Sequence, residues 1–189
     1  MCPLFTLSET NVCLCGEKKC MIKGKIVGVC TSDRKGISKK NIGAALLETG
    51  SGLKGDAHAG PWHRQVSLLA KESLDKFQIR NPSASLGTRP KSEIGLGSFA
   101  ENLTTEGLDL KNLPVGTELK VGQFVRLRIT QIGKECHTKC AIGRKVGDCI
   151  MPVEGVFAEV LAGGTVKVDD AIAVISPADT THQPDKTNR

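Results

Sequence analysis

Hydrophobic and polar residues alternate over several short segments of this 189-residue chain, which is the pattern expected of half-buried β-strands. Five segments predict strands: residues 21–29, 65–69, 125–130, 165–168 and 171–175. Strict alternation is clearest at residues 125–130, Val-Arg-Leu-Arg-Ile-Thr. The last two segments flank Asp169-Asp170, where the sequence predicts a turn between two strands.

Helical patterns are few by comparison. Residues 70–77 predict one helix, and residues 140–145 predict a short turn or helix. Residues 81–97 are rich in Pro, Ser and Gly and indicate a long loop, while short apolar segments ending in Gly116 and Gly122 are typical of tight turns. The sequence therefore predicts a mainly β fold, most economically a closed or partly closed barrel with a few short helices.

The ends of the chain lack this patterning. Residues 1–20 show neither helical nor strand periodicity, and we expect a flexible, cysteine-containing extension there. The folded domain is expected over residues 21–176, followed by a disordered polar tail at 177–189.

Composition narrows the function classes. No apolar segment approaches the roughly 18–20 residues that a membrane helix needs, and the N-terminus has no basic start followed by an apolar block. We therefore expect a cytoplasmic protein without a membrane partner. Aromatic residues make up only 3% of the chain, which argues against single-stranded nucleic acid as a ligand.

Positive charge is concentrated near the N-terminus. Residues 17–40 contain eight Lys or Arg and two acidic residues, so this segment carries the whole formal net charge of +6. It is interpreted either as a solvated face or as a patch that binds an anionic ligand.

A glycine-bounded loop at residues 55–65 holds Asp56, His58, His63 and Arg64. Glycine allows a ligand to approach the backbone closely, and an arginine fork can hold a phosphate. The alternative is a loop whose polar side chains satisfy its own backbone.

The sequence Lys-Glu-Cys-His-Thr-Lys-Cys at residues 134–140 follows a predicted strand. Flanking cations such as Lys134 favour the thiolate form of Cys136 and Cys140, which attacks sulfur or binds a soft metal. The alternative is a pair of small buried hydrophobic residues.

Two weaker signals remain. Glu101 and Asn102 are expected side by side on a strand, where they can read ring nitrogens and amide groups of a ligand. Cys13, Cys15 and Cys20 resemble part of a zinc knuckle, without a complete set of four ligands.

Several of these segments together resemble the MOSC domain, which is named for the C-terminal part of molybdenum-cofactor sulfurases. The resemblance spans residues 23–175. It lies in residues 55–60, 62–69, 100–107, 130–142, 147–152, 154–158 and 163–166. It implies a β-barrel-like fold of the small stand-alone bacterial type and a role with the molybdenum cofactor, a molybdopterin that is expected to be labile or absent after purification.

The resemblance also implies roles for particular residues. It assigns the functional thiol, as a nucleophile or a molybdenum ligand, to Cys140, with Cys136 as the competitor. Arg64, Lys134 and the basic segment are expected to hold the phosphate of the pterin. The side chains expected to contact the pterin or shape its pocket are His58, Glu101 and Asn102.

The leading interpretation is a cofactor-binding or sulfur-carrier module that binds molybdenum or relays persulfide sulfur. Its expected partner is a pyridoxal-phosphate cysteine desulfurase, a molybdoenzyme or a cofactor-synthesis protein. One alternative is a molybdenum-dependent reductase of N-oxygenated compounds. Another is a zinc-binding or thiol-redox protein that uses Cys136, His137, Cys140 and the N-terminal cysteines.

Overall fold

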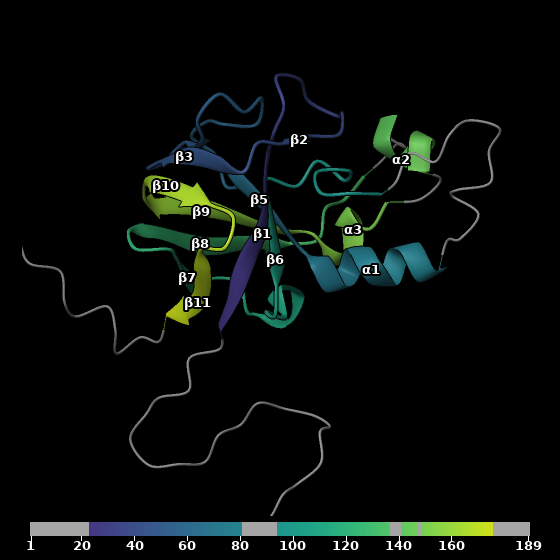
Figure 1. Ribbon diagram of the computed structural model, residues 1–189. Coiled ribbons are helices and arrows are strands. Elements are labelled where there is room, and N and C mark those ends of the chain that lie inside the picture. Colours follow the sequence, from purple (N-terminus) through teal and green to yellow (C-terminus); the bar gives the residue numbers. More distant parts are fainter. Residues whose placement is uncertain (1–22, 81–93, 137–140, 147–148, 176–189) are drawn as a thin grey trace, which may run out of the picture.

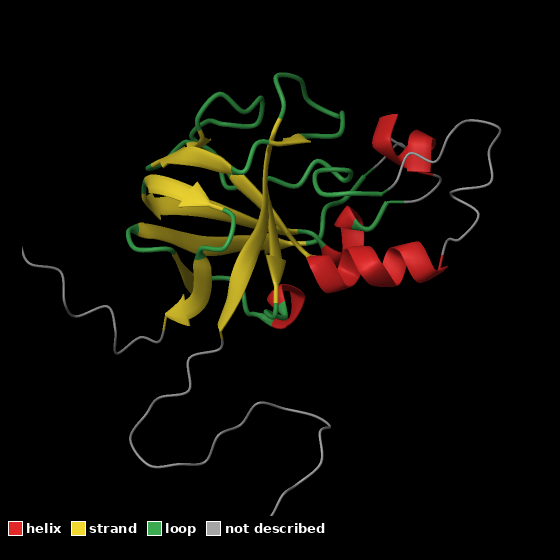
Figure 2. Cartoon of the chain, viewed as in Figure 1, coloured by secondary structure: helices red, strands yellow, loops and turns green. Residues whose placement is uncertain are grey.

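Strands dominate the computed structural model, which describes residues 23–80, 94–136, 141–146 and 149–175 (Figures 1 and 2). The strands are β1 (Lys23–Thr31), β2 (Lys40–Asn41), β3 (Ala44–Glu48), β4 (Gly52–Leu53), β5 (Val66–Ala70), β6 (Leu103–Glu106), β7 (Glu118–Val121), β8 (Val125–Ile132), β9 (Val156–Ala162), β10 (Gly164–Lys167) and β11 (Ala171–Ile175). The helices are α1 (Lys71–Arg80), α2 (Ala141–Val146) and α3 (Met151–Glu154), with a 3-10 turn, η2, at Leu110–Asn112.

Seven of these strands close into a barrel. The order is β11-β7-β8-β9-β5-β6-β1, and β1 pairs back onto β11, which completes the ring. The β5–β6 pair is parallel, and the other pairs in the ring are antiparallel. A closed ring pairs the backbone of every strand, so no barrel edge stays open. The predicted mainly β barrel with short helices is confirmed.

Side-chain alternation explains how the barrel fills. On β8, Val125, Leu127 and Ile129 are buried, whereas Arg126 and Arg128 point outward and pair with Glu118 on β7. Aliphatic residues from the other strands complete the same core. With so few aromatics in the chain, Val, Ile and Leu carry the packing of the barrel.

Three short strands form a second, smaller sheet. The segments on either side of Asp169-Asp170 are β10 and β11, as predicted, but they do not pair with each other. Instead β10 pairs with β3 in a three-stranded sheet with β4, and β11 enters the barrel. Asp169 has a left-handed φ of 71°, and its turn redirects the chain between two sheets.

The helices gather on one side of the barrel (Figure 2). A second apolar cluster lies there and is separate from the barrel core. Its members come from β5, α1, α2, α3, β9 and the segment before β6: Leu69, Leu74, Phe77, Phe99, Ile142, Met151 and Phe157. Among the described residues, no helix is long and apolar enough to span a membrane.

Candidate functional site

A pocket of about 300 Å³ opens beside this second cluster and brings together segments that are distant in sequence. Its walls come from the β1–β2 loop, the loop before β5, the segment before β6, the residues after β8, and α2 and α3. Ser67 of β5 and Phe157 of β9, which pair in register, line it as well. The helical side of the barrel therefore holds a concave site of the size that small ligands occupy.

Five of the seven site residues predicted from sequence line this pocket. They are His58, Arg64, Asn102, Lys134 and Cys136. The loop that carries Lys134 and Cys136 leaves the barrel at Gly133, whose φ of 72° and close approach to the carbonyl of Pro152 leave no room for a Cβ. The sixth, Cys140, lies outside the described residues.

The seventh predicted residue, Glu101, is fully buried and does not line the pocket. It precedes β6, so the expectation that Glu101 and Asn102 sit on a strand is wrong. The Glu101 carboxylate accepts backbone N–H bonds from Gly97 at 2.6 Å and Phe99 at 3.1 Å. Burial, the dominant influence, raises the pKa of Glu101 despite these bonds. Glu101 therefore stabilises the backbone of the pocket wall from the protein interior.

The side chain of Asn102 forms hydrogen bonds within the same pocket wall. Its Oδ1 accepts hydrogen bonds from the backbone N–H and the hydroxyl of Ser67, at 3.1 and 2.9 Å, and its Nδ2 donates to the carbonyl of Cys30 at 3.2 Å. Next to it, Ala100 adopts a left-handed φ of 63°, an uncommon conformation for a residue with a side chain. Asn102 thus shapes the pocket by tying β5 to β1.

Three cations contribute positive charge to the pocket lining. Lys35, Arg64 and Lys134 line it, and no Asp or Glu does so among the described residues. The Arg64 guanidinium lies 4.9 Å from the ring centre of Trp62 and 5.7 Å from that of Phe157. Its Nε is buried without a hydrogen-bond partner, and it forms no ion pair with any described residue. Such a surplus of cations suits an anionic ligand.

Two thiols line the same pocket. Cys136 is exposed and Cys149 is half-buried. A wider hollow of about 600 Å³ adjoins the pocket, and the two share Arg64, Lys134 and Cys136. His63 lies in that wider hollow rather than in the pocket.

Cys30, in contrast, is fully buried. Burial first, and then the nearby charge of Glu101, raises its pKa to about 12, so it stays a thiol at neutral pH.

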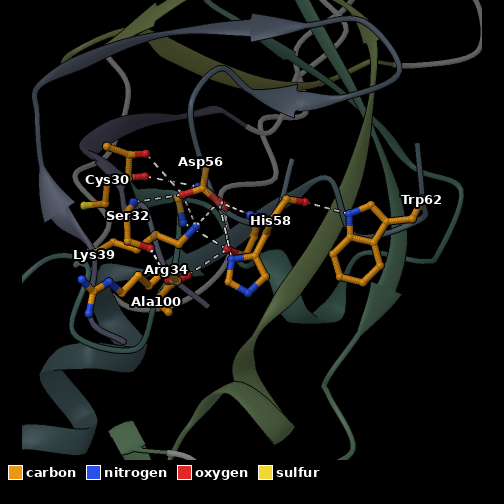
Figure 3. Close-up of polar contacts among 11 residues, drawn as sticks. Cys30, Ser32, Arg34, Lys39, Asp56, His58, Trp62 and Ala100 are labelled. Carbon is orange, nitrogen blue, oxygen red and sulfur yellow. Dashed lines mark hydrogen bonds and ion pairs between the residues drawn. The ribbon is translucent and has the colours of Figure 1, made fainter. Parts of the chain in front are cut away.

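Beneath the pocket, the Asp56 carboxylate organises a buried polar network (Figure 3). Lys39 Nζ donates to both carboxylate oxygens at 2.6 Å, and both side chains are fully buried. The backbone N–H groups of Ser32 and His58 donate to the same carboxylate at 3.1 and 3.0 Å. Asp56 thus joins the loop that carries Lys35 to the loop that carries His58.

Charge pairing keeps Asp56 ionised. Burial acts against the carboxylate, but hydrogen bonds from His58 and Lys39 and the charge of Lys39 outweigh it, so the pKa of Asp56 lies well below its usual range. Burial lowers the pKa of Lys39, and the bonded Asp56 opposes that shift.

The described cations of the basic segment at residues 17–40 have different surroundings in the structure. Lys39 is buried against Asp56, and Lys25 pairs with Glu106 at 2.9 Å, so among the described cations of this segment Lys35 alone lines the pocket. Sequence reasoning missed the individual role of Lys35 and the Lys39–Asp56 pair. Nothing in the spacing of Lys39 and Asp56 signals their contact.

Comparison with protein families decides the identity of the fold. The family model described as the MOSC domain matches residues 55–173, which is more than half of the chain. The chain belongs to the MOSC domain family. MOSC domains are generally linked to binding of the molybdenum cofactor. No curated protein matches the sequence significantly.

Solved structures show the same MOSC fold. The YuaD protein from Bacillus subtilis is similar with a TM-score of 0.65 and 17% identity, over 82% of this chain and 96% of that one. YiiM from Escherichia coli is similar with a TM-score of 0.60 and 20% identity, over 82% of this chain and 70% of that one. YiiM from Geobacillus stearothermophilus has a TM-score of 0.55 and 17% identity, with coverages of 82% and 74%.

Proposed function

We propose that the pocket binds the molybdenum cofactor and that a cysteine at its edge ligates molybdenum or relays sulfur. The observation that carries this proposal is Arg64. It is a cation that lies close to two aromatic rings, its buried Nε has no hydrogen-bond partner among the described residues, and none of the described pocket-lining residues is acidic. An arginine without a carboxylate partner retains its full capacity to bind a phosphate.

The donor set fits a phosphorylated pterin. Arg64, Lys35 and Lys134 supply charge for the phosphate, and Phe99, Met151 and Phe157 supply apolar surface for a flat ring. When bound, the cofactor would supply a redox-active metal that the side chains cannot provide. The protein would orient the pterin and place a thiol near its metal.

The position of Cys136 supports a thiol role. It lies where the pocket meets the wider hollow, beside Lys134 and Arg64, so its sulfur can be reached from two directions. Thiolates bind soft metals such as molybdenum. Cys140, the other candidate thiol from the sequence, lies outside the described residues.

The same position suits a sulfur relay. A thiolate at the edge would attack the outer sulfur of a donor persulfide; a new S–S bond forms, the donor S–S bond breaks, and the donor cysteine leaves as a thiolate. The donor in this proposal is the persulfide of a pyridoxal-phosphate cysteine desulfurase. The wider hollow would admit the donor segment while the pocket holds the acceptor.

The test is metal and pterin analysis of protein purified without oxygen from cells supplied with molybdate. We expect molybdenum and pterin in the wild type, and at least a tenfold loss of molybdenum in either Cys136→Ser or Cys140→Ser. Cys30→Ala is the matched control, because Cys30 is fully buried and does not line the pocket. Wild-type protein without molybdenum or pterin would overturn stable cofactor binding and shift the assignment to the sulfur relay.

Two outcomes redirect the assignment. If cysteine and a desulfurase leave a persulfide on Cys136 or Cys140, detected by alkylation and mass spectrometry, the relay is supported; if neither residue carries it, the relay is wrong. One equivalent of zinc in place of molybdenum would favour the zinc alternative. Within the described ranges, no group of three or more His, Cys, Asp or Glu lies close enough to hold a metal.

A further inference from the structure

His58 is fixed in the pocket wall by two hydrogen bonds of its backbone. Its N–H donates to Oδ1 of Asp56 at 3.0 Å, and its carbonyl accepts a 2.8 Å hydrogen bond from the indole N–H of Trp62 (Figure 3). These two bonds hold the peptide on both sides of the ring. The imidazole is 24% exposed and lines the pocket.

The two ring nitrogens of His58 have different surroundings. Nδ1 is buried, makes no close hydrogen bond to any described residue, and lies 3.5 Å from Oδ1 of Asp56. Because Lys39 keeps Asp56 ionised, a lone pair on Nδ1 would face a negative charge, whereas an N–H there would be attracted to it. The other edge of the ring is the part left to face the pocket.

The geometry points to Asp56 as a positioning residue that holds His58 with its proton on Nδ1, so that neutral Nε2 is a hydrogen-bond acceptor toward the pocket. An acceptor at this point selects ligands that present an N–H or O–H, as a pterin ring does, over ligands that carry only an anionic group. This inference rests on the proposed function, since it names how the pocket distinguishes the ring of the cofactor from its phosphate.

His63 provides an internal control with the opposite arrangement. Its Nε2 lies 3.1 Å from Oε1 of Gln131, while Nε2 of Gln131 donates to the carbonyl of Gly133 at 2.8 Å. Because this second bond fixes the amide orientation, His63 must donate through Nε2–H. The two histidines are therefore expected to hold different tautomers in one molecule.

The experiment is a long-range ¹⁵N correlation spectrum at about pH 8.5, where histidine side chains are generally neutral. Single His→Gln variants assign the signals. We expect the Nδ1–H tautomer for His58 and the Nε2–H tautomer for His63. In Asp56→Asn the His58 signal should move toward Nε2–H while His63 stays unchanged. An Nε2–H signal for His58 in the wild type overturns the inference, and that measurement needs no variant to fold.

Binding of two probes separates this inference from the proposed function. For 6-hydroxymethylpterin, we expect binding about tenfold weaker in His58→Phe, with partial rescue in His58→Gln, which retains an acceptor. Inorganic phosphate should bind equally well to all three proteins. Equal pterin affinity in His58→Phe and the wild type, or no pterin binding at all, overturns the selective role, while phosphate binding independently reports on the cation site.

Discussion

Lys39 and Arg64 are two cations near one pocket, and they differ in whether an acidic side chain pairs with them. Lys39 is fully buried, with both oxygens of Asp56 at 2.6 Å. Arg64 rests between Trp62 and Phe157 and has no acidic partner among the described residues. Asp56 neutralises the charge of Lys39, whereas no described residue neutralises the charge of Arg64, which is left for a bound ligand.

The difference indicates that the charge of Lys39 stabilises the folded site, whereas the charge of Arg64 is available to a ligand. Removing one partner of a buried ion pair leaves an uncompensated charge and destabilises the fold. Removing a stacked cation without a partner costs little stability but deprives an anionic ligand of its contact. We therefore expect Lys39 to govern stability and Arg64 to govern binding.

The largest expected effect is that of Lys39→Met. Asp56 would stay buried without its counter-ion, and we expect a loss of about 3–5 kcal/mol in the free energy of unfolding, measured with urea at pH 7. Lys71→Met is the matched control, because Lys71 on α1 also pairs with an Asp at 2.6 Å, but its side chain is 40% exposed. A similar loss in both variants would contradict the contrast between buried and exposed pairs.

The pH dependence of Lys39→Met carries a further signature. In the wild type the lowered pKa of Asp56 gives stability that is present above its unfolded value of 3.8 and is lost as the pH falls through the folded value. Without Lys39, burial raises the pKa of Asp56, so the variant should gain stability relative to the wild type as the pH falls from 7 toward 5. A constant difference over that range would count against the pairing.

Glu101→Gln is expected to have an intermediate effect. An amide cannot accept from both the Gly97 and Phe99 N–H groups, and we expect a loss of about 1–3 kcal/mol. Because the pKa of Glu101 is raised, wild-type stability falls as the pH rises from 4.5 through the folded value, so the variant's loss should be greater at pH 5 than at pH 8. Urea titrations at pH 5 and pH 8 measure this difference, with Glu135→Gln, at an exposed position, as the control. A loss of stability that is greater at pH 8 than at pH 5 would contradict the raised pKa of Glu101.

The smallest effect on stability should come from Arg64→Gln. Only the stacking on Trp62 and Phe157 is lost, which is worth about 0.5–1 kcal/mol. Thermal and urea unfolding of the protein without cofactor measure it. A loss as large as that of Lys39→Met would show that Arg64 is a structural residue.

The fold was largely predictable from local patterns. Alternation on β8 and β11 and the helical pattern of α1 depend on neighbours in sequence, and these elements lie where the patterns placed them. The pairing of β10 with β3 was not predictable, because adjacent strands joined by a short turn ordinarily pair with each other. Long-range pairing, unlike alternation, leaves no trace within the segment itself.

The candidate site was predictable in its residue types and less so in their roles. His58, Arg64, Lys134 and Cys136 combine charge or reactivity with loop positions, and all four line the pocket. Glu101 carries the same kind of polar signal but bonds to the backbone behind the wall. A sequence shows that a carboxylate is present, but only the folded chain shows which direction it faces.

We propose that Arg64 is left unpaired by the described residues in order to bind an anionic cofactor. This proposal is tested most directly by the molybdenum and pterin content of wild type, Arg64→Gln and Lys120→Gln, purified together without oxygen; Lys120 is an exposed cation on β7, outside the pocket. We expect at least a tenfold loss of both molybdenum and pterin in Arg64→Gln and wild-type content in Lys120→Gln. Equal content in all three proteins would contradict it.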